Sequence, residues 1–329
     1  MSTRYDVVGI GNAIIDVISQ STDDFLSEES IAKGGMTLID AHRADSLYAK
    51  MGPGMETSGG SAANTLAGCA ALDVRSGFIG RVRNDQLGEV YMHDIRAVGV
   101  DFTNTPAQDG LPTARCLILV TPDGQRSMNT FLGASTELGV GDLDDAMIAG
   151  SAITYMEGYL WDKELAKEAF LKAMEIAHGA GRKVSLTLSD SFCVDMHRAE
   201  FLDLISGKVD ILFANEAEIL SLFETDDFDA AVSAVSGKVP IAAITRSEKG
   251  ALILSADGQD EIAAQPVDKV VDTTGAGDQF AAGFLAGLAK GHSPARSGHM
   301  GAVAAAEVIS HIGPRPQEDV AALIDKALS

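Results

Sequence analysis

The chain has 329 residues, of which 46% are hydrophobic, and it carries a formal net charge of −22. A chain of this length can bury a large core, either in two average domains or in one large α/β domain. A surface with this much negative charge repels phosphate backbones, and no basic cluster interrupts it. The composition therefore argues against a nucleic-acid partner.

The cysteines and the N-terminal residues bear on the compartment. Cys69, Cys116 and Cys193 lie far apart and show no Cys-x-x-Cys spacing, which predicts free thiols in a reducing compartment and no zinc site. The N-terminus lacks a signal-like apolar region, and no stretch reaches the roughly 18 apolar residues of a membrane span. We therefore expect a cytoplasmic protein without membrane contact.

The N-terminal part of the chain predicts a strand and then an irregular excursion. Residues 5–10 read as a buried strand that leads into the sequence GIGN at positions 9–12. A dinucleotide-binding fingerprint is rejected there, because Ile14 stands where the third glycine is required. Residues 16–57 show no clean periodicity and are interpreted as a segment that leaves the core.

From Ser61 onward the elements become regular. Ser61 is placed to cap a helix of small residues, which predicts close packing. Residues 76–79 predict a strand and residues 85–98 a helix. The segments 113–121 and 126–132, joined by a Pro-Asp-Gly-Gln turn, predict an antiparallel hairpin.

Strands and helices alternate after about residue 141. The predicted strands are residues 153–156, 183–188, 210–214 and 241–245; the predicted helices run from Asp162 to about 179 and over 199–205, 216–223 and 230–235. Such alternation predicts a parallel sheet with helices on both faces. Active sites in such sheets lie at the carboxyl ends of the strands.

The last part of the chain predicts a second hairpin and two long helices. The hairpin covers 250–255 and 261–264, and a short strand is expected at 269–271. The first helix follows the sequence DTTGAGDQF at 272–280 and retains Gly283 and Gly287, each of which costs about 1 kcal/mol in an exposed helix interior. We therefore expect tight contact with another element. The second helix runs from Pro294 to about residue 311.

The glycine-rich segment 272–280 predicts an anion site at a strand-to-helix junction. Gly275 and Gly277 allow a sharp bend that aims consecutive N–H groups at one point, and the helix adds its positive end. Asp278 in the first turn is placed to act as a base beside a bound phosphate. The alternative is an ordinary helix start, in which Asp278 only complements the helix dipole.

Other polar residues at predicted strand ends should meet Asp278 at one sheet edge; they are Asn12, Asp16, Asn215, Glu218 and Thr245. All of these except Asn12 also have a purely structural alternative. Asn215 and Glu218 also fit a capping box, Asp16 fits an ordinary turn, and Thr245 fits an ordinary strand end. The histidines show no ligand spacing. The chain lacks the P-loop, His-Glu-x-x-His and Gly-x-Ser-x-Gly motifs, which disfavours P-loop ATPases and serine hydrolases.

Three ordered motifs resemble those of one enzyme family. DTTGAGDQF at 272–280 resembles the C-terminal signature of the ribokinase-like sugar and nucleoside kinases, the PfkB family. GGSAAN at 59–64 with GRVRNDQLG at 80–88 resembles the N-terminal signature, and NEAE at 215–218 matches the family's Asn-x-x-Glu. Within the family the chain is most similar to adenosine kinases, in the segments 11–16, 126–134 and 188–192.

The resemblance implies a ribokinase-like α/β fold of three layers, α/β/α, in one kinase domain over residues 1–329. Its central sheet is mostly parallel. A small β lid, formed by about 13–57 and 103–132 and hinged at Gly59 and Gly60, would close over the sheet edge and exclude water.

The resemblance also implies roles for individual residues. Asp278 would be the catalytic base, and the amides of Gly275, Ala276 and Gly277 would stabilise the transferring phosphoryl group. The other roles are substrate binding by Asn12, Asp16, Gly59, Gly60, Asn64, Tyr159 and Phe192; ATP binding by Asn215, Thr245, Gly250, Gly275, Gly277 and Ala305; Mg²⁺ binding by Glu218 and Asn215, through water; and binding of a monovalent cation, K⁺, by Asp272 and Thr274.

The implied reaction is ATP- and Mg²⁺-dependent phosphorylation of a primary hydroxyl on a ribosyl or sugar substrate, with adenosine as the best single candidate. Two alternatives stay open: a kinase of free sugars such as ribose, fructose or a keto-deoxy acid, and a catalytically silent relative that binds sugar or nucleotide. Gln279 stands where the family usually has a small residue, and few aromatic residues are placed to stack on a purine. Both a monomer and a homodimer are compatible with the sequence.

Overall fold

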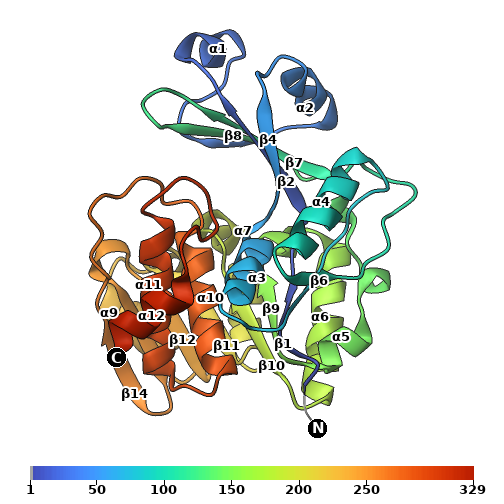
Figure 1. Ribbon diagram of the computed structural model, residues 1–329. Helices are drawn as coiled ribbons and strands as arrows, with labels where there is room; N and C mark the ends of the chain where they lie inside the picture. The colour runs from blue at the N-terminus through green and yellow to red at the C-terminus, as the bar shows by residue number, and fades with distance from the viewer. Residues whose placement is uncertain (1–2) are drawn as a thin grey trace.

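A computed structural model describes residues 3–329, and their strands form two separate sheets (Figure 1). In this part of the chain the larger sheet has nine strands in the order β14-β13-β12-β11-β10-β9-β1-β5-β6. The strands from β12 to β6 are parallel, and β13 and β14 form the antiparallel hairpin predicted near residue 257. Their bounds are β1 (Tyr5–Ile10), β5 (Ser76–Ile79), β6 (Val100–Phe102), β9 (Ser151–Glu157), β10 (Lys183–Thr187), β11 (Ile211–Asn215), β12 (Ile241–Thr245), β13 (Ala251–Ser255) and β14 (Gly258–Ile262).

Helices cover both faces of the large sheet, because successive strand residues point to opposite sides and both sides are apolar. Along β1, Val7 packs into the core on one face, whereas Val8 and Ile10 pack into the core on the other. One face carries α3 (Ser61–Ala71), α4 (Gln86–Ala97), α10 (Ala276–Ala289), α11 (Pro294–Val308) and α12 (Val320–Leu328). The other carries α5 (Asp145–Ala149), α6 (Glu164–Gly179), α7 (Ser191–Ile205), α8 (Glu216–Leu222) and α9 (Phe228–Val235). The predicted three-layer α/β/α architecture is confirmed.

The second sheet has five strands in the order β3-β8-β7-β2-β4 and lies beyond one edge of the large sheet, with two short helices on its far side (Figure 1). Its elements are β2 (Ile14–Gln20), α1 (Asp23–Glu28), β3 (Met36–Leu38), α2 (Ala41–Tyr48), β4 (Gly54–Gly59), β7 (Ala114–Val120) and β8 (Arg126–Phe131). The antiparallel pairing of β7 with β8 confirms the predicted hairpin. The segment 16–57 therefore contains three strands and two helices, each too short to produce a visible period.

The structure differs from the sequence-based prediction in one strand and at the start of two helices. Residues 269–271 form no strand; Val270 and Val271 are exposed, and the Val271 N–H donates to the Ile309 carbonyl in a loop. The helix expected over 199–205 is the second part of α7, which is kinked at His197; the sequence did not predict the first part, which begins at Ser191 and is capped by Asp190 through the Phe192 N–H. The helix expected to open at Asp162 begins at Glu164 without a side-chain cap.

The helices α10 and α11 pack closely against each other, as Gly283 and Gly287 predicted. A Cβ on Gly283 would lie 2.6 Å from the Met300 carbonyl oxygen, and one on Gly287 would lie 2.5 Å from Ser297 Oγ. In turn, Gly301 of α11 accommodates the Phe280 carbonyl of α10. Since none of these positions has room for a methyl group, the glycines allow the backbones of α10 and α11 to approach closely.

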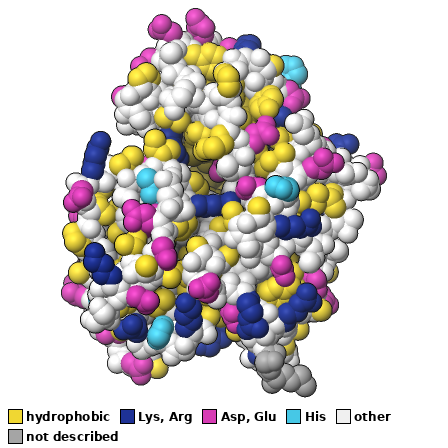
Figure 2. Space-filling view, in the orientation of Figure 1, with side chains coloured by type: hydrophobic (Ala, Val, Ile, Leu, Met, Phe, Trp, Pro, Cys, Tyr) yellow, Lys and Arg dark blue, Asp and Glu magenta, His cyan; other side chains and the backbone are white. Residues whose placement is uncertain are grey.

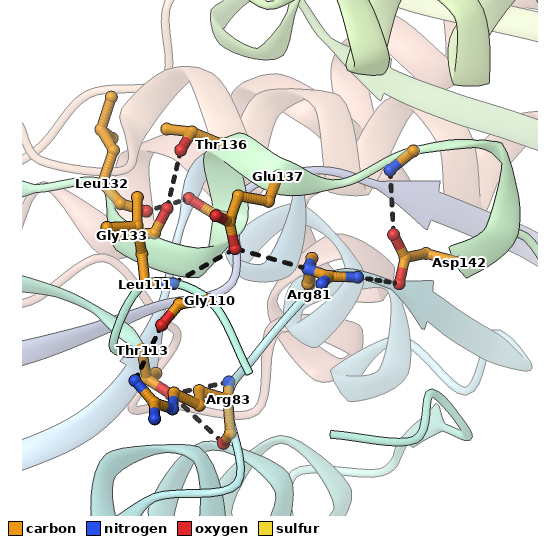
Figure 3. A network of polar contacts seen from close by, with 12 residues as sticks. Arg81, Arg83, Gly110, Leu111, Thr113, Leu132, Gly133, Thr136, Glu137 and Asp142 are labelled. Carbon is orange, nitrogen blue, oxygen red and sulfur yellow. Dashed lines mark hydrogen bonds and ion pairs between the residues drawn. The ribbon is translucent and has the colours of Figure 1, made fainter. Parts of the chain in front are cut away.

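The segment 80–88 joins the two sheets at one side through ion pairs (Figure 3). Arg81 Nη1 lies 2.8 Å from Asp142 Oδ1, and its Nε lies 4.0 Å from Glu137 Oε2. Arg83 Nη1 donates to the Gly110 carbonyl, which lies in the connection from β6 to β7. The chain segments that enter and leave the small sheet on this side are therefore anchored to the core. None of the helices among residues 3–329 combines the length and apolarity needed to cross a membrane.

Candidate active site

The carboxyl ends of β1 and β9 meet where the strand order reverses, which is where sites form in such sheets. Asn12 follows β1, and its backbone N–H donates to Oε1 of Glu157, the last residue of β9, at 2.7 Å. The Asn12 side chain donates to the same oxygen, and the Ala62 N–H donates to Oε2 at 2.8 Å. Burial raises the pKa of Glu157 to about 7. Glu157 was not predicted as a site residue, because its only signal in the sequence is that an acid ends an apolar strand.

Asp278 lies in the first turn of α10, as predicted. The turn before it depends on Gly275, which has φ +78° and whose Cβ would lie 2.6 Å from Pro314. The Ser61 hydroxyl donates to Asp278 Oδ1 at 2.6 Å. Ser61 is the first residue of α3 and does not cap it, contrary to the sequence-based prediction; its side chain points across to α10 instead. This bond brings the N-terminal ends of two helices to the same carboxylate.

The carboxylates near this point carry raised pKa values. Loss of solvation raises the pKa of Asp278 to about 6, although hydrogen bonds from Ser61 and Asn64 and the charge of Arg315 oppose the shift. Loss of solvation also raises the pKa of Asp16 to about 6, and the negative charge of Asp278 adds to that shift. A carboxyl group with a pKa near 6 accepts a proton more readily than an ordinary aspartate, which suits a general base.

The predicted anion site is open on the side of Gly277. A Cβ on Gly277 would meet no atom within 4 Å, and the amides of Gly277 and Asp278 lie in the first turn, where a helix offers no internal acceptor. The Ala276 amide differs from our expectation, because it donates to the Thr273 carbonyl at 3.2 Å. The amides of Gly277 and Asp278 are therefore better placed than that of Ala276 to receive an anion.

Asn215 and Glu218 satisfy both interpretations that the sequence allowed. They form a capping box on α8: the Glu218 N–H donates to Asn215 Oδ1 at 2.8 Å, and the Asn215 N–H donates to Glu218 Oε2 at 3.0 Å. The Asn215 side chain also donates to Glu218 Oε1 at 2.7 Å. Both residues line the cleft that contains Asp278, and burial raises the pKa of Glu218 to about 7.

Two connected cavities open at this edge of the sheet. The first, which we call the Asp278 cleft, has a volume of about 420 Å³ and is lined by Ser61, Tyr159, Asn215, Glu218, Gly275, Gly277 and Asp278. The second, the Ala305 cavity, has a volume of about 560 Å³ and is lined mainly by apolar residues of the 264–270 loop and α11, together with Gly250. Thr245, Thr273 and Gly277 line both. Figure 2 shows a hollow between the small sheet and the body of the molecule.

The glycines at the base of the small sheet are in close contact with the site. A Cβ on Gly59 would lie 2.4 Å from Asp16 Oδ2, and one on Gly60, where φ is +102°, would lie 2.1 Å from the Asn12 carbonyl oxygen. Phe192 lines neither cavity and has 66% of its surface exposed, whereas Tyr159 lines the Asp278 cleft. Of the two predicted aromatic contacts, the structure brings only Tyr159 to the site.

Asp272 and Thr274 are bonded to a side chain of the small sheet. Thr274 donates to Asp272 Oδ1 through both its N–H and its hydroxyl, at 3.0 and 2.7 Å. Asp272 Oδ2 accepts from the Gly313 N–H at 3.0 Å and lies 2.9 Å from Arg126 Nη1. Both side chains of this ion pair are 9% exposed. Arg126 was not predicted, because it is brought to Asp272 only by the pairing of β8.

Comparison with known proteins assigns the chain to a family. Residues 28–320 match the model of the pfkB family of carbohydrate kinases. A structure from Rhizobium etli CFN 42, described as a probable sugar kinase protein, is 51% identical and covers 99% of both chains with a TM-score of 0.91. The structure of an adenosine kinase from Sinorhizobium meliloti is 50% identical over 98% of this chain and 99% of that chain, with a TM-score of 0.90.

A curated relative supports the same assignment. An adenosine kinase from Saccharomyces cerevisiae is 27% identical over 95% of this chain and 98% of its own length. The family match covers most of the chain, and the two bacterial structures share half of its residues. This chain is therefore a kinase and belongs to the pfkB family of carbohydrate kinases.

Proposed function

We propose that this kinase transfers the terminal phosphoryl group of ATP to the primary hydroxyl of a ribosyl substrate, with adenosine as the preferred acceptor. The observation that carries the proposal is the position of Asp278 in the cleft, beside first-turn amides with no internal acceptor. The choice of adenosine is supported by the Sinorhizobium meliloti and Saccharomyces cerevisiae adenosine kinases, to which the chain is similar along nearly its whole length.

The chemical step assigns one role to each group. As the acceptor oxygen bonds to the terminal phosphorus of ATP and the bond to ADP breaks, Asp278 accepts the hydroxyl proton. The amides of Gly275, Gly277 and Asp278 donate to the phosphoryl oxygens, and loss of one such donor typically costs about 2.7–4 kcal/mol of transition-state stabilisation. Asp16, Gly59, Gly60 and Asn64 hold the sugar hydroxyls, and Tyr159 contacts the base.

The nucleotide fits the two connected cavities. The Ala305 cavity is apolar, as a flat base requires, and it joins the Asp278 cleft along Thr245 and Gly277. The phosphates would then reach the N-terminus of α10. Asn215 and Glu218 suit Mg²⁺, because an amide and a carboxylate on the cleft wall offer the oxygen ligands that this ion binds, directly or through water. Mg²⁺ held by these residues would supply positive charge beside the phosphates.

A K⁺ site at Asp272 and Thr274 does not fit these residues. The Arg126 guanidinium supplies a positive charge to Asp272 Oδ2, and Thr274 already occupies Oδ1. A cation would therefore have to displace an ion pair with little exposed surface. We propose that exchange of K⁺ for Na⁺ leaves the rate unchanged.

We propose that the small sheet moves as a lid. Its chain enters the core at Gly59 and Gly60, and Gly60 has a backbone conformation that other residues rarely adopt. Closure over the Asp278 cleft would exclude water, which otherwise competes with the acceptor for the phosphoryl group.

A kinase of free sugars is the second candidate, because the Rhizobium etli relative is described as a probable sugar kinase protein. The test is a panel of acceptors, including adenosine, other nucleosides, ribose, fructose and a keto-deoxy acid, with ADP release as the readout. We expect the highest kcat/KM with adenosine. A clear preference for a free sugar would end the adenosine proposal, and release of no ADP with any acceptor would favour a catalytically silent binding protein.

A further inference from the structure

The segment that follows α11, residues 313–315, bonds to several of the elements around the site. Gly313 donates to Asp272 through its N–H, and the Pro314 carbonyl accepts from Gln279 Nε2 at 2.9 Å. Gln279 also donates to the Asn64 carbonyl at 3.1 Å. The larger side chain at position 279 thus joins α10 to α3 and to this segment.

Arg315, the next residue, bonds to three elements at once. Its Nε donates to Asn64 Oδ1 at 3.1 Å, its Nη2 donates to Ser58 Oγ at 2.9 Å, and its Nη1 lies 3.3 Å from Asp94 Oδ2. Asp94 in turn accepts from both the N–H and the hydroxyl of Ser58. Ser58 immediately precedes the two glycines at which the small sheet meets the core.

The bond to Asn64 decides which way its amide faces. Because Oδ1 accepts from Arg315, the donor NH₂ group of Asn64 is left for Asp278, whose pKa the Asn64 side chain lowers. An amide turned the other way would present its oxygen to a carboxylate, which cannot donate when ionised. The bond from Arg315 to Asn64 therefore fixes which end of the amide is available to the base.

We propose that Arg315 is a positioning residue, which orients the Asn64 amide toward Asp278 and holds the base of the small sheet in register with it. This inference rests on the proposed kinase reaction, and it adds a residue that none of the motifs contains. The guanidinium suits the role because its donors lie in one rigid plane and reach three partners in fixed directions.

The charge of Arg315 acts on the same groups. Burial raises the pKa of Asp16, Asp278 and Tyr91, and the charge of Arg315 opposes this rise and so favours the anionic form of the two carboxylates. The titratable and charged groups around this point are Asp16 of β2, Tyr91 and Asp94 of α4, Arg126 of β8, Tyr155 and Glu157 of β9, Tyr159 and Asp278. Arg126 also acts on Asp16, so removal of Arg315 lowers the local positive charge without abolishing it.

The test compares Arg315→Met and Arg315→Lys with Arg75→Met. Arg75 pairs with Asp6 at the opposite end of the sheet, so its loss controls for the removal of one ion pair. With the best acceptor of the panel, we expect Arg315→Met to raise the acceptor KM, leave the ATP KM in place, and move the acid limb of kcat/KM to higher pH. Arg315→Lys should restore the acid limb but not the acceptor KM, because an ammonium group keeps the charge without the three-way geometry.

A second measurement does not depend on turnover. Thermal unfolding at pH 8 is followed for Arg315→Met, Asp278→Asn and the double variant, which together measure the coupling of the two positions. We expect Arg315→Met to lower Tm less when residue 278 is already neutral. Additive changes in Tm, or an acid limb and acceptor KM that match those of Arg75→Met, would overturn the proposal. If the wild-type chain releases no ADP but the Tm changes at positions 315 and 278 are not additive, the kinase reaction is refuted and the positioning role is kept.

Discussion

The two sheets differ in how much of their surface is covered. Helices bury both faces of the nine-stranded sheet, whereas the five-stranded sheet leaves large side chains in water, among them Met36, Leu38 and Met55. One apolar face of the small sheet has only a small core around Cys116, Ile118 and Val120. The large sheet therefore forms the platform that positions Asp278. The other face of the small sheet, with Ile15, Val17, Leu117 and Leu119, packs into the same core as α3 and α4.

The largest effect should come from the platform side of the site. We expect Asp278→Asn to lower turnover by about 10²–10⁴-fold, because an amide cannot accept the acceptor proton. Binding of ATP, followed by titration calorimetry, should persist, since the Ala305 cavity does not contain residue 278. Near-normal turnover in a variant that binds ATP would remove Asp278 from the base role.

The next prediction concerns the packing of the platform. Gly283→Ala should destabilise the protein by about 1–3 kcal/mol, because the new methyl group would overlap the Met300 carbonyl of α11. Gly179→Ala is the control, since its Cβ would meet nothing within 4 Å at the end of α6. Urea unfolding should show a loss of stability for the first variant only. Equal stabilities would mean that α10 and α11 can separate freely.

The next prediction concerns Gly60, where the small sheet is attached, and uses Gly124 as its control. Gly60→Ala should cost about 1–3 kcal/mol and impair turnover, because φ is +102° and a Cβ would overlap the Asn12 carbonyl. Gly124→Ala, in the turn between β7 and β8, also places alanine at a positive φ, here +81°, but its Cβ would meet no atom within 4 Å. The control should lose stability without the additional loss of kcat. If both variants behave alike in kcat, Gly60 has no special role at the attachment.

The last prediction concerns the dependence on pH. The folded-state pKa values of Asp278 and Asp16 are about 6 and those of Glu157 and Glu218 about 7, all above their ordinary values. The folded protein thus binds protons more tightly than the unfolded chain, so these groups lower stability as the pH rises from about 4 to about 7. We expect Tm to fall over this range and less steeply in Asp278→Asn. Turnover should fall below about pH 6 as Asp278 is protonated.

Much of the platform followed from local sequence. Apolar runs of strand length that alternate with helical periods predict a parallel sheet between two helix layers, and the glycine-rich turn before Asp278 predicts an anion site at a helix N-terminus. These predictions succeed because each depends on neighbouring residues only: Gly275 adopts its left-handed conformation, and the Asn215–Glu218 capping box forms, within a few positions of chain. The five-stranded sheet was foreseen only through its hairpin and the family resemblance.

The remaining site residues were decided by tertiary structure. Glu157 reaches Asn12 across 145 positions, Ser61 reaches Asp278 across 217, and Arg315 reaches Asn64 across 251. No pattern in the sequence pairs such residues, because their contact depends on strand order and on the packing of α3 against α10. The chain by itself thus determined where a phosphate could bind and which carboxylate stands beside it. Only the folded molecule determined which side chains orient that carboxylate and raise its pKa, since both effects require burial among distant segments.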